Sequence, residues 1–208
     1  MVAAANRARQ PGHASSASVG IGPWASCNYS PACAKVYYSA QNAISPMIRP
    51  ADEADLPGIL AIYNDVIVSS TAVYTDSPVP LQERKAWLDA RRAQHYPILV
   101  AADGPDVMGF ASFSDFRPWP SYRHTVEHSV HVRSDRRGSG IGGRLVRELF
   151  PMAIALDKHV MIAGVDAANE GSLRFHERLG FERVAHLKEV GHKFGRWLDL
   201  VFLQRFLK

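Results

Sequence analysis

Cysteine is scarce in this 208-residue sequence, and its two cysteines, Cys27 and Cys33, both lie in the first 46 residues. Residues 47–208 therefore offer no disulfide framework, no cysteine-ligated zinc site and no catalytic thiol. No window holds eighteen uncharged apolar residues, so we expect no membrane-spanning helix. With 47% hydrophobic and 21% charged residues, the chain is not collagen-like, coiled-coil or wholly disordered. These features fit a reducing compartment, and we expect a cytoplasmic protein.

Acidic residues are missing from residues 1–46, and the basic residues there give the segment a charge of +3: Arg7, Arg9 and Lys35. The whole chain carries +4, which leaves only +1 for residues 47–208. We therefore expect no nucleic-acid partner. Residues 1–46 are rich in Ala, Ser, Gly and Pro without periodicity, which predicts a disordered N-terminal extension or leader. A transit peptide is an alternative, because the segment is Ser-rich and acid-free.

A domain is expected over residues 47–208, where strand and helix patterns alternate. Asp52 is the expected N-cap of its first helix, and Gly180 the C′ glycine that ends its last helix. Helices are expected at 52–69, at 81–94, from a glycine-rich turn to about 157, and at 170–179. Strands are expected at 47–51, 97–102, 107–113, 123–132, 160–165 and 197–202, with one more before the last. This order predicts an α+β fold, an α/β sandwich with helices on both faces of one mixed central sheet.

The glycine-rich turn at 136–144 reads Arg-Arg-Gly-Ser-Gly-Ile-Gly-Gly-Arg, follows a strand and opens a helix. Glycines let backbone N–H groups approach a ligand, the helix N-terminus adds partial positive charge, and the arginines add full charges. We expect a pyrophosphate site here, although a flexible surface loop is the alternative. The candidate binding residues are Arg137, Gly138, Ser139, Gly140, Ile141, Gly142 and Gly143.

The identity of the phosphate ligand is open from these residues alone. The sequence has no GxxxxGK[ST] motif, so a P-loop nucleotide site is unsupported. Gly138, Gly140 and Gly143 match the G-x-G-x-x-G fingerprint of dinucleotide-binding enzymes. That fingerprint normally follows an apolar buried strand, whereas the strand before this turn carries Glu127 and His131.

The same turn contains Arg137-x-x-Gly140-x-Gly142, which resembles the coenzyme A loop of the GNAT acetyltransferases. The resemblance runs from about Met47 to the C-terminus. It includes the strand at 125–132 and the segment 169–181, which is similar to the family's Asn-containing helix with its Leu-Gly-Phe end. It implies the GNAT fold, acetyl-CoA as co-substrate, N-acetyltransferase activity and a homodimer.

A narrower resemblance connects the chain to the phosphinothricin and methionine sulfoximine acetyltransferases. It rests on four short segments that coincide in order: 116–119, 122–127, 174–177 and 191–195. This branch implies a small amino acid or a related analogue as the acceptor of the acetyl group.

Acetylation of an amine needs an unprotonated nucleophile, which a general base can supply directly or through water. Glu127 is the candidate, because it is the only acid in the strand at 123–132. Strand alternation places it on one face with Thr125, Ser129 and His131, and partial burial would raise its pKa toward a useful value. An exposed edge-strand carboxylate is the alternative, and the resemblance, which places a base here, favours the catalytic role.

The leaving thiolate benefits from a proton donor, and many family members have a Tyr seven residues after the Asn of the short helix. In this sequence the residue seven positions after Asn169 is His176. A histidine at this position is a further resemblance to the narrower branch. The resemblance implies that His176 is a general acid or positions substrate and thiolate, whereas an ordinary surface histidine is the alternative. It also places Asn169 near the pantetheine arm, whose amides can pair with the backbone of Val130, His131 and Val132.

The carboxylate of an amino-acid substrate needs a binding group, and a guanidinium fits it well. Arg117 and Arg123 lie just before Glu127 and are candidates, and Tyr74 is a further candidate for the pocket wall. The loop between the two arginines supplies the remaining candidates: Trp119, Pro120, Ser121 and Tyr122. Core packing or a dimer interface is the alternative for the aromatic residues.

Other features carry less functional information. His124 and His128 are four residues apart on a strand, about 13 Å, so they cannot share one metal, and we predict no metal site. The pairs Arg84-Lys85 and Arg91-Arg92 are expected on a solvated helix face. The alternatives to amino-acid acetylation are a peptide or polyamine acceptor, a non-catalytic acyl-CoA-binding module, and a dinucleotide-binding enzyme.

Overall fold

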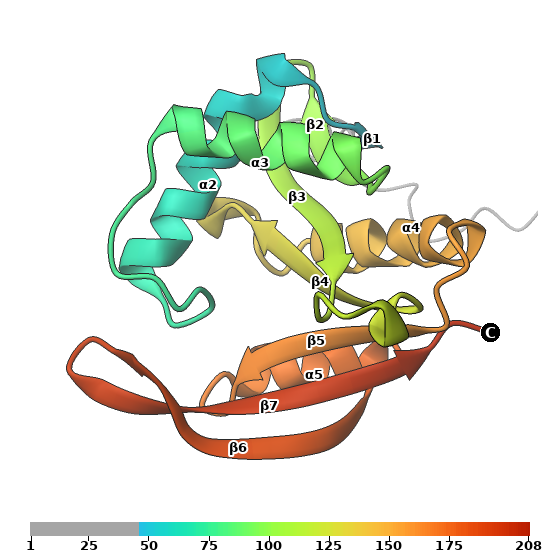
Figure 1. Ribbon diagram of the computed structural model, residues 1–208. Helices are drawn as coiled ribbons and strands as arrows, with labels where there is room; N and C mark the ends of the chain where they lie inside the picture. Colours follow the sequence, from blue (N-terminus) through green and yellow to red (C-terminus); the bar gives the residue numbers. More distant parts are fainter. Residues whose placement is uncertain (1–45) are drawn as a thin grey trace, which may run out of the picture. The chain divides into compact units, whose positions relative to one another are not determined.

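The computed structural model of the protein describes residues 46–208 (Figure 1). The predictions made for the N-terminal extension lie outside these residues. The described chain forms one seven-stranded sheet in the order β1-β2-β3-β4-β5-β7-β6. Its strands are β1 (Met47–Pro50), β2 (Ile98–Asp103), β3 (Asp106–Asp115), β4 (Thr125–Val132), β5 (Val160–Asp166), β6 (Glu182–Lys193) and β7 (Arg196–Phe206). Its α-helices are α2 (Leu56–Ser69), α3 (Leu81–Ala93), α4 (Ile141–Ala155) and α5 (Glu170–Arg178).

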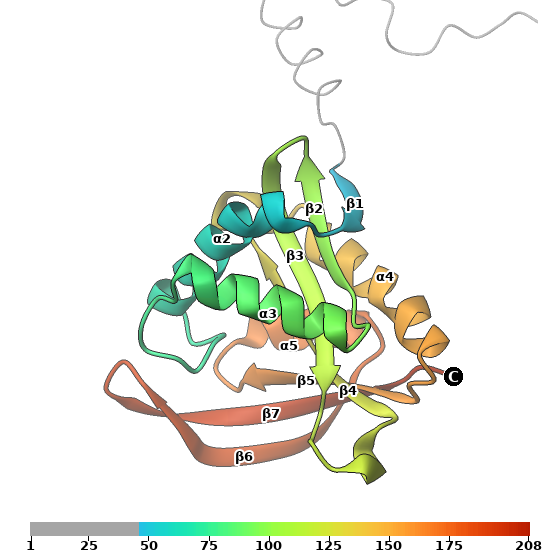
Figure 2. The same ribbon diagram turned by 45° about the horizontal axis from the view of Figure 1, so that its top comes forward.

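Helices cover both faces of the sheet, as the alternation of side chains in β2 illustrates. Val100 and Ala102 belong to an apolar cluster with Ile59 and Ile62 of α2, against which Trp87 of α3 packs. The intervening residues of β2 belong to a second cluster with α4 and α5, formed by residues such as Leu99, Ala101, Leu145 and Leu173. Figures 1 and 2 show α2 and α3 on one side and α4 and α5 on the other. The predicted α+β sandwich is confirmed.

The helix ends follow the sequence closely. Asp52 caps a short 3₁₀ turn, accepting from the Ala54 N–H, and α2 proper begins four residues later at Leu56. Gly180 follows α5 with φ +82°, which is the left-handed conformation expected of a C′ glycine. The last strand is longer than predicted, because β7 pairs with β5 as far as Phe206.

All neighbouring strands are antiparallel except β4 and β5. The parallel ladder joins only Thr125–Glu127 to Val160–Ile162. Beyond it, β4 stays paired with β3 as far as Val132, and β5 stays paired with β7 as far as Asp166. The two strands therefore part immediately after Glu127, in the middle of the sheet.

Candidate active site

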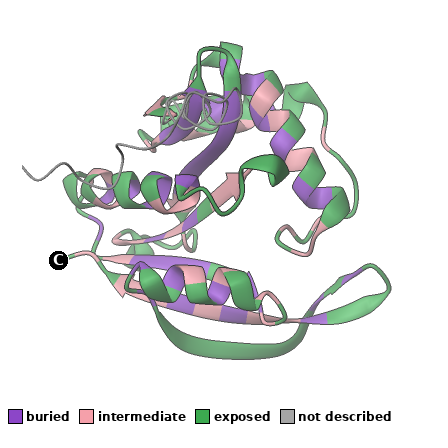
Figure 3. Cartoon of the chain, turned by 180° about the vertical axis from the view of Figure 1, so that it is seen from behind, coloured by how far each residue is buried: buried purple, intermediate pink, exposed green. Residues whose placement is uncertain are grey.

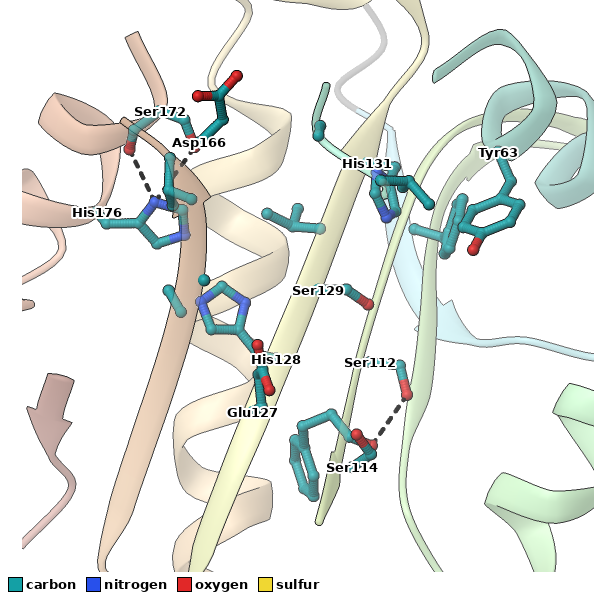
Figure 4. Close-up of a pocket in the computed structure, with 18 of the residues that line it drawn as sticks. Tyr63, Ser112, Ser114, Glu127, His128, Ser129, His131, Asp166, Ser172 and His176 are labelled. Carbon is teal, nitrogen blue, oxygen red and sulfur yellow. Dashed lines mark hydrogen bonds between the residues drawn. The ribbon is translucent and has the colours of Figure 1, made fainter. Parts of the chain in front are cut away.

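A cavity of about 410 Å³ lies where β4 and β5 part (Figure 4). Its walls come from α2, α3, β3, β4, β5 and α5, together with the loop after α2. The two predicted catalytic residues, Glu127 and His176, both line it, as do Val130, His131 and Asn169. The fold thus brings together residues that are up to 49 positions apart in the sequence.

Glu127 lies on the β4 face that looks toward α2 and α3. His131 shares this face, since its ring packs against Tyr63 and Phe110 at centroid distances of 5.7 and 5.1 Å. The side chain of Glu127 is half-buried. Burial raises the pKa of its carboxyl, an effect that the nearby positive charge of Arg117 opposes. The carboxyl is therefore a stronger proton acceptor than a solvated glutamate.

His128 and His176 meet on the opposite face of β4, with ring centroids 5.2 Å apart. His176 donates its Nδ1–H to the Ser172 carbonyl at 2.8 Å, which leaves Nε2 without a proton in the neutral ring. Burial lowers its pKa, although the bond to Ser172 works in the other direction. Burial, with His176 nearby, lowers the pKa of His128 to about 3, and both of its ring nitrogens are buried without a hydrogen-bond partner among the described residues.

The glycine-rich turn lines a second cavity of about 390 Å³ at the N-terminus of α4. Gly138 and Gly140 have φ of +79° and +82°, a conformation that favours glycine. The first N–H groups of a helix have no partner within the helix, and no side chain of residues 46–208 caps those of α4. The cavity wall also holds four arginines: Arg136, Arg137, Arg147 and Arg178. Such a wall suits a pyrophosphate.

The other predicted cofactor residues connect or support the two cavities. Val130 and His131 line the first and Val132 the second, so one strand edge runs from one cavity to the other. Asn169 is the N-cap of α5, and its Oδ1 accepts from the Ser172 N–H at 3.0 Å. Ser139 differs from its neighbours, because its hydroxyl donates to the Arg136 carbonyl at 2.6 Å.

The family model described as the acetyltransferase (GNAT) family matches residues 59–181. The chain belongs to the GNAT family of acetyltransferases. Both the predicted family and the predicted acetyltransferase class are thereby confirmed. The family also favours coenzyme A over a dinucleotide as the ligand of the glycine-rich turn.

Several known proteins similar to this GNAT acetyltransferase carry the names of the predicted branch. An L-methionine sulfoximine/L-methionine sulfone acetyltransferase of Pseudomonas paraeruginosa is 52% identical, over 77% of this chain and 94% of that protein. A phosphinothricin N-acetyltransferase of Streptomyces coelicolor is 35% identical, over 76% of this chain and 94% of that protein. The structure of a Salmonella typhimurium acetyltransferase with its cofactor acetyl-CoA is 43% identical, with a TM-score of 0.76 over 78% of this chain and 94% of that one.

The predicted substrate residues of this GNAT acetyltransferase do not line the cavity. Arg117 lies over the Phe116 ring at 4.1 Å, and Arg123 donates to the Pro120 carbonyl at 3.3 Å. The loop between them is exposed: Trp119, Pro120, Ser121 and Tyr122. The hydroxyl of Tyr74 donates to the Asp199 carbonyl at 3.4 Å. Arg117 influences the site through its effect on the pKa of Glu127, and the pKa of Tyr74 is raised by burial and by the nearby charge of Asp166, which lines the cavity.

The expectation of a solvated arginine face on the second helix is wrong for Arg84. The residue is only 7% exposed and lines the cavity, as do Trp87 and Arg91 of the same helix. Their positions, together with the buried Leu88, follow the i, i+3, i+4, i+7 spacing of one helix face. That spacing is the sequence signal that identifies these residues. Because two of the four are arginines, the face was expected to be exposed to solvent.

Two sets of hydrogen bonds hold the loop after α2 and the end of β5, both of which contribute residues to the cavity wall. Asp166, at the end of β5, accepts a hydrogen bond from the Thr71 hydroxyl and another from the Ala168 N–H at 3.0 Å. Lys193 donates to three carbonyls at the end of α2 and in the loop after it, those of Ile67, Ser70 and Val73, at 2.7–2.9 Å.

In residues 46–208, no helix is long and apolar enough to cross a membrane, and no cluster of His, Cys, Asp or Glu side chains is arranged to hold a metal.

Proposed function

We propose that this protein transfers the acetyl group of acetyl-CoA to the amino group of a small amino acid or a close analogue, with Glu127 as general base. The observation that carries the proposal is the half-buried Glu127 carboxyl, with a raised pKa, on the cavity wall where β4 and β5 part. The similarity to amino-acid acetyltransferases supports the acceptor class.

The residues present fit coenzyme A. Gly138 and Gly140, the free N–H groups of α4 and the surrounding arginines would hold the pyrophosphate. The β4 backbone between the two cavities, at Val130–Val132, would pair with the pantetheine arm. When bound, acetyl-CoA supplies the acetyl group as an activated thioester.

The protein's own groups prepare the acceptor. The Glu127 carboxylate takes a proton from the acceptor's ammonium group, directly or through a water, and so frees the amine lone pair for attack. His176 is neutral near pH 7, because burial lowers its pKa, and its Nδ1–H is held by the Ser172 carbonyl, so Nε2 carries no proton. We therefore assign His176 a positioning role, with Nε2 as a hydrogen-bond acceptor, in preference to a general acid.

Two observations weigh against the alternatives. The cavity wall holds the guanidinium groups of Arg84 and Arg91, which repel a cationic polyamine. A non-catalytic acyl-CoA-binding module has no need of a buried carboxyl at position 127, since burial of a carboxylate costs free energy.

The test is thiol release from acetyl-CoA by wild type and Glu127→Gln, with methionine sulfone, phosphinothricin, natural amino acids, a polyamine and a lysine peptide. We expect release with the first two acceptors, lower by at least about 100-fold in the variant, as for a lost general base. Release with only the peptide or the polyamine would overturn the acceptor class. Coenzyme A binding without any release would leave an acyl-CoA-binding module.

We further propose that two copies of the chain pair through the β6 edge of the sheet. β6 is exposed along most of its length (Figure 3), including the apolar side chains of Val184, Leu187 and Val190. An exposed apolar edge strand is prone to pair with other chains, and a second copy of the chain bound to it would cover it. Light scattering should give a dimer mass for wild type and for the control Val68→Glu, an exposed position on α2, and a monomer mass for Val190→Glu. A monomeric wild type would overturn this assembly.

A further inference from the structure

The four arginines that line the second cavity, at the glycine-rich turn, are not equivalent. Arg136 pairs with the carboxylate of the residue before it at 3.4 Å, and Arg137 donates its Nε–H to the Val132 carbonyl at 3.3 Å. Arg147 and Arg178, in contrast, make no hydrogen bond or ion pair with any residue in 46–208. Both line the cavity and are exposed to solvent. Their guanidinium groups are therefore available to a ligand.

Arg147 extends along α4 toward the N-terminus of this helix. Its Nη1 atom lies 3.2 Å from the place that a Cβ atom on Gly143 would occupy. Gly143 is four residues earlier in the sequence, and side chains of a helix lean toward its N-terminus. The guanidinium group of Arg147 thus lies beside the first turn of α4, where it does not cap the N–H groups of that turn.

Arg178 reaches the same cavity from α5. Three residues before it, Phe175 packs on the first turn of α4, with Cε2 3.5 Å from the place that a Cβ atom on Gly142 would occupy. Residues three apart lie on the same face of a helix, and both Phe175 and Arg178 line the cavity. The contact between the two helices therefore brings one guanidinium group from α4 and one from α5 to a single cavity.

Coenzyme A carries more negative charge than its pyrophosphate alone. Its ribose bears a 3′-phosphate, and a phosphomonoester has a charge of about −1.5 to −2 at pH 7. The glycine-rich turn and the N–H groups of α4 suit the pyrophosphate, so the further phosphate needs cations of its own. Guanidinium groups bind phosphate with paired hydrogen bonds. Of the described arginines in this cavity wall, Arg147 and Arg178 are the two that have no protein partner.

We infer that Arg147 and Arg178 bind the 3′-phosphate of coenzyme A and make the enzyme selective for coenzyme A donors over their 3′-dephospho forms. The inference rests on the proposed function, since it concerns the acetyl donor of that reaction. It separates these two arginines from the groups that would hold the pyrophosphate.

The test is calorimetric titration with coenzyme A and with 3′-dephospho-coenzyme A, which lacks only the 3′-phosphate. We expect wild type to bind coenzyme A more tightly than the dephospho form. Arg147→Met and Arg178→Met should each weaken coenzyme A binding about tenfold, the low end for a hydrogen bond to a charged group, because both arginines are exposed. The affinity for the dephospho form should change less than about threefold, since solvent and salt screen the remaining charges. Arg174→Met is the control, because Arg174 is an exposed arginine of α5 that pairs with Glu170 and lines neither cavity.

Kinetics with the two acetyl donors gives a second readout. The 3′-phosphate is remote from the thioester, so each variant should have a higher KM for acetyl-CoA with an unchanged kcat, as for binding that is equal in the ground and transition states. Equal losses of affinity for the two ligands would mean that the arginines bind the pyrophosphate, and would overturn the inference. Unchanged coenzyme A affinity in both variants would overturn it as well. A wild type that binds coenzyme A with the expected selectivity but acetylates no amino acid would instead overturn the proposed function.

Discussion

Glu127 Oε1 of β4 lies only 3.0 Å from the place that a Cβ atom on Gly164 of β5 would occupy. The neighbouring strand β7 closes the same space, since Leu200 Cδ1 and Phe202 Cε1 lie 3.5 and 3.6 Å from that position. Because Gly164 has no side chain, it leaves space for the Glu127 carboxyl group. The φ of this glycine is not in the left-handed region, so space and not backbone conformation calls for glycine here.

Gly164→Ala should therefore displace the proposed base without straining the backbone. A Cβ at 3.0 Å obliges the carboxylate to shift by a few tenths of an ångström. Because a displacement of about 1 Å at a reacting group can cost 100-fold in rate, we expect part of that loss here. We expect kcat to fall at least about tenfold while coenzyme A affinity stays within twofold. The matched control is Gly171→Ala, where the nearest atom, Asn169 Oδ1, is 3.7 Å away. Activity of Gly164→Ala within twofold of wild type would contradict the role given to this contact.

The sequence predicts most of the framework because local patterns control it. Strand alternation places Glu127 and His131 on one face of β4, and the rings around His131 agree. The positive φ of Gly138 and Gly140 explains why glycines mark the turn before α4. These features depend on residues close together in the sequence.

The residues on the acceptor side of the site could not be predicted from the sequence, because their positions depend on contacts between elements that are distant in the chain. The spacing of Arg84, Trp87, Leu88 and Arg91 marks one face of α3, but nothing within the helix tells that Arg84 packs against Tyr63 of α2. Arg123 is close to Glu127 in the sequence, which suggests that it binds the substrate. It precedes β4, however, and is not among the residues that line the cavity. The contacts that bury the charged residues of this face form only when the helices pack on the sheet.

Gly140→Ala should weaken coenzyme A binding. An Ala at φ +82° costs about 1–2 kcal/mol, which the turn can relieve only by moving the N–H groups that would bind the pyrophosphate. We expect the dissociation constant of coenzyme A, measured by calorimetry, to rise about tenfold. Gly104→Ala is the control, because Gly104 also has positive φ and open space but lies in the β2–β3 hairpin. Both variants should lose similar stability, and equal coenzyme A affinity in the two would refute the prediction.

Lys193→Met should loosen the loop after α2, which forms part of the cavity wall. The substitution leaves the carbonyls of Ile67, Ser70 and Val73 without their ammonium donor, which should cost about 1–3 kcal/mol in the free energy of unfolding. Because Ala72 and Val73 line the cavity, we also expect a higher KM for the acceptor. Urea unfolding and acceptor kinetics check both effects, with the exposed Lys188→Met as control. A variant with unchanged stability would show that the three hydrogen bonds contribute nothing net.

The stability of the protein should fall in mild acid because of His128. Its pKa is lowered to about 3 in the folded state by burial, against about 6.5 in an unfolded chain, so between these values the unfolded state binds one more proton. The free energy of unfolding then falls by about 1.4 kcal/mol per pH unit for this residue as the pH drops from 6.5 toward 4. Urea unfolding between pH 4.5 and 7.5 should give a slope smaller by this amount in His128→Leu. An unchanged slope in His128→Leu would mean that His128 takes up its proton in the folded state.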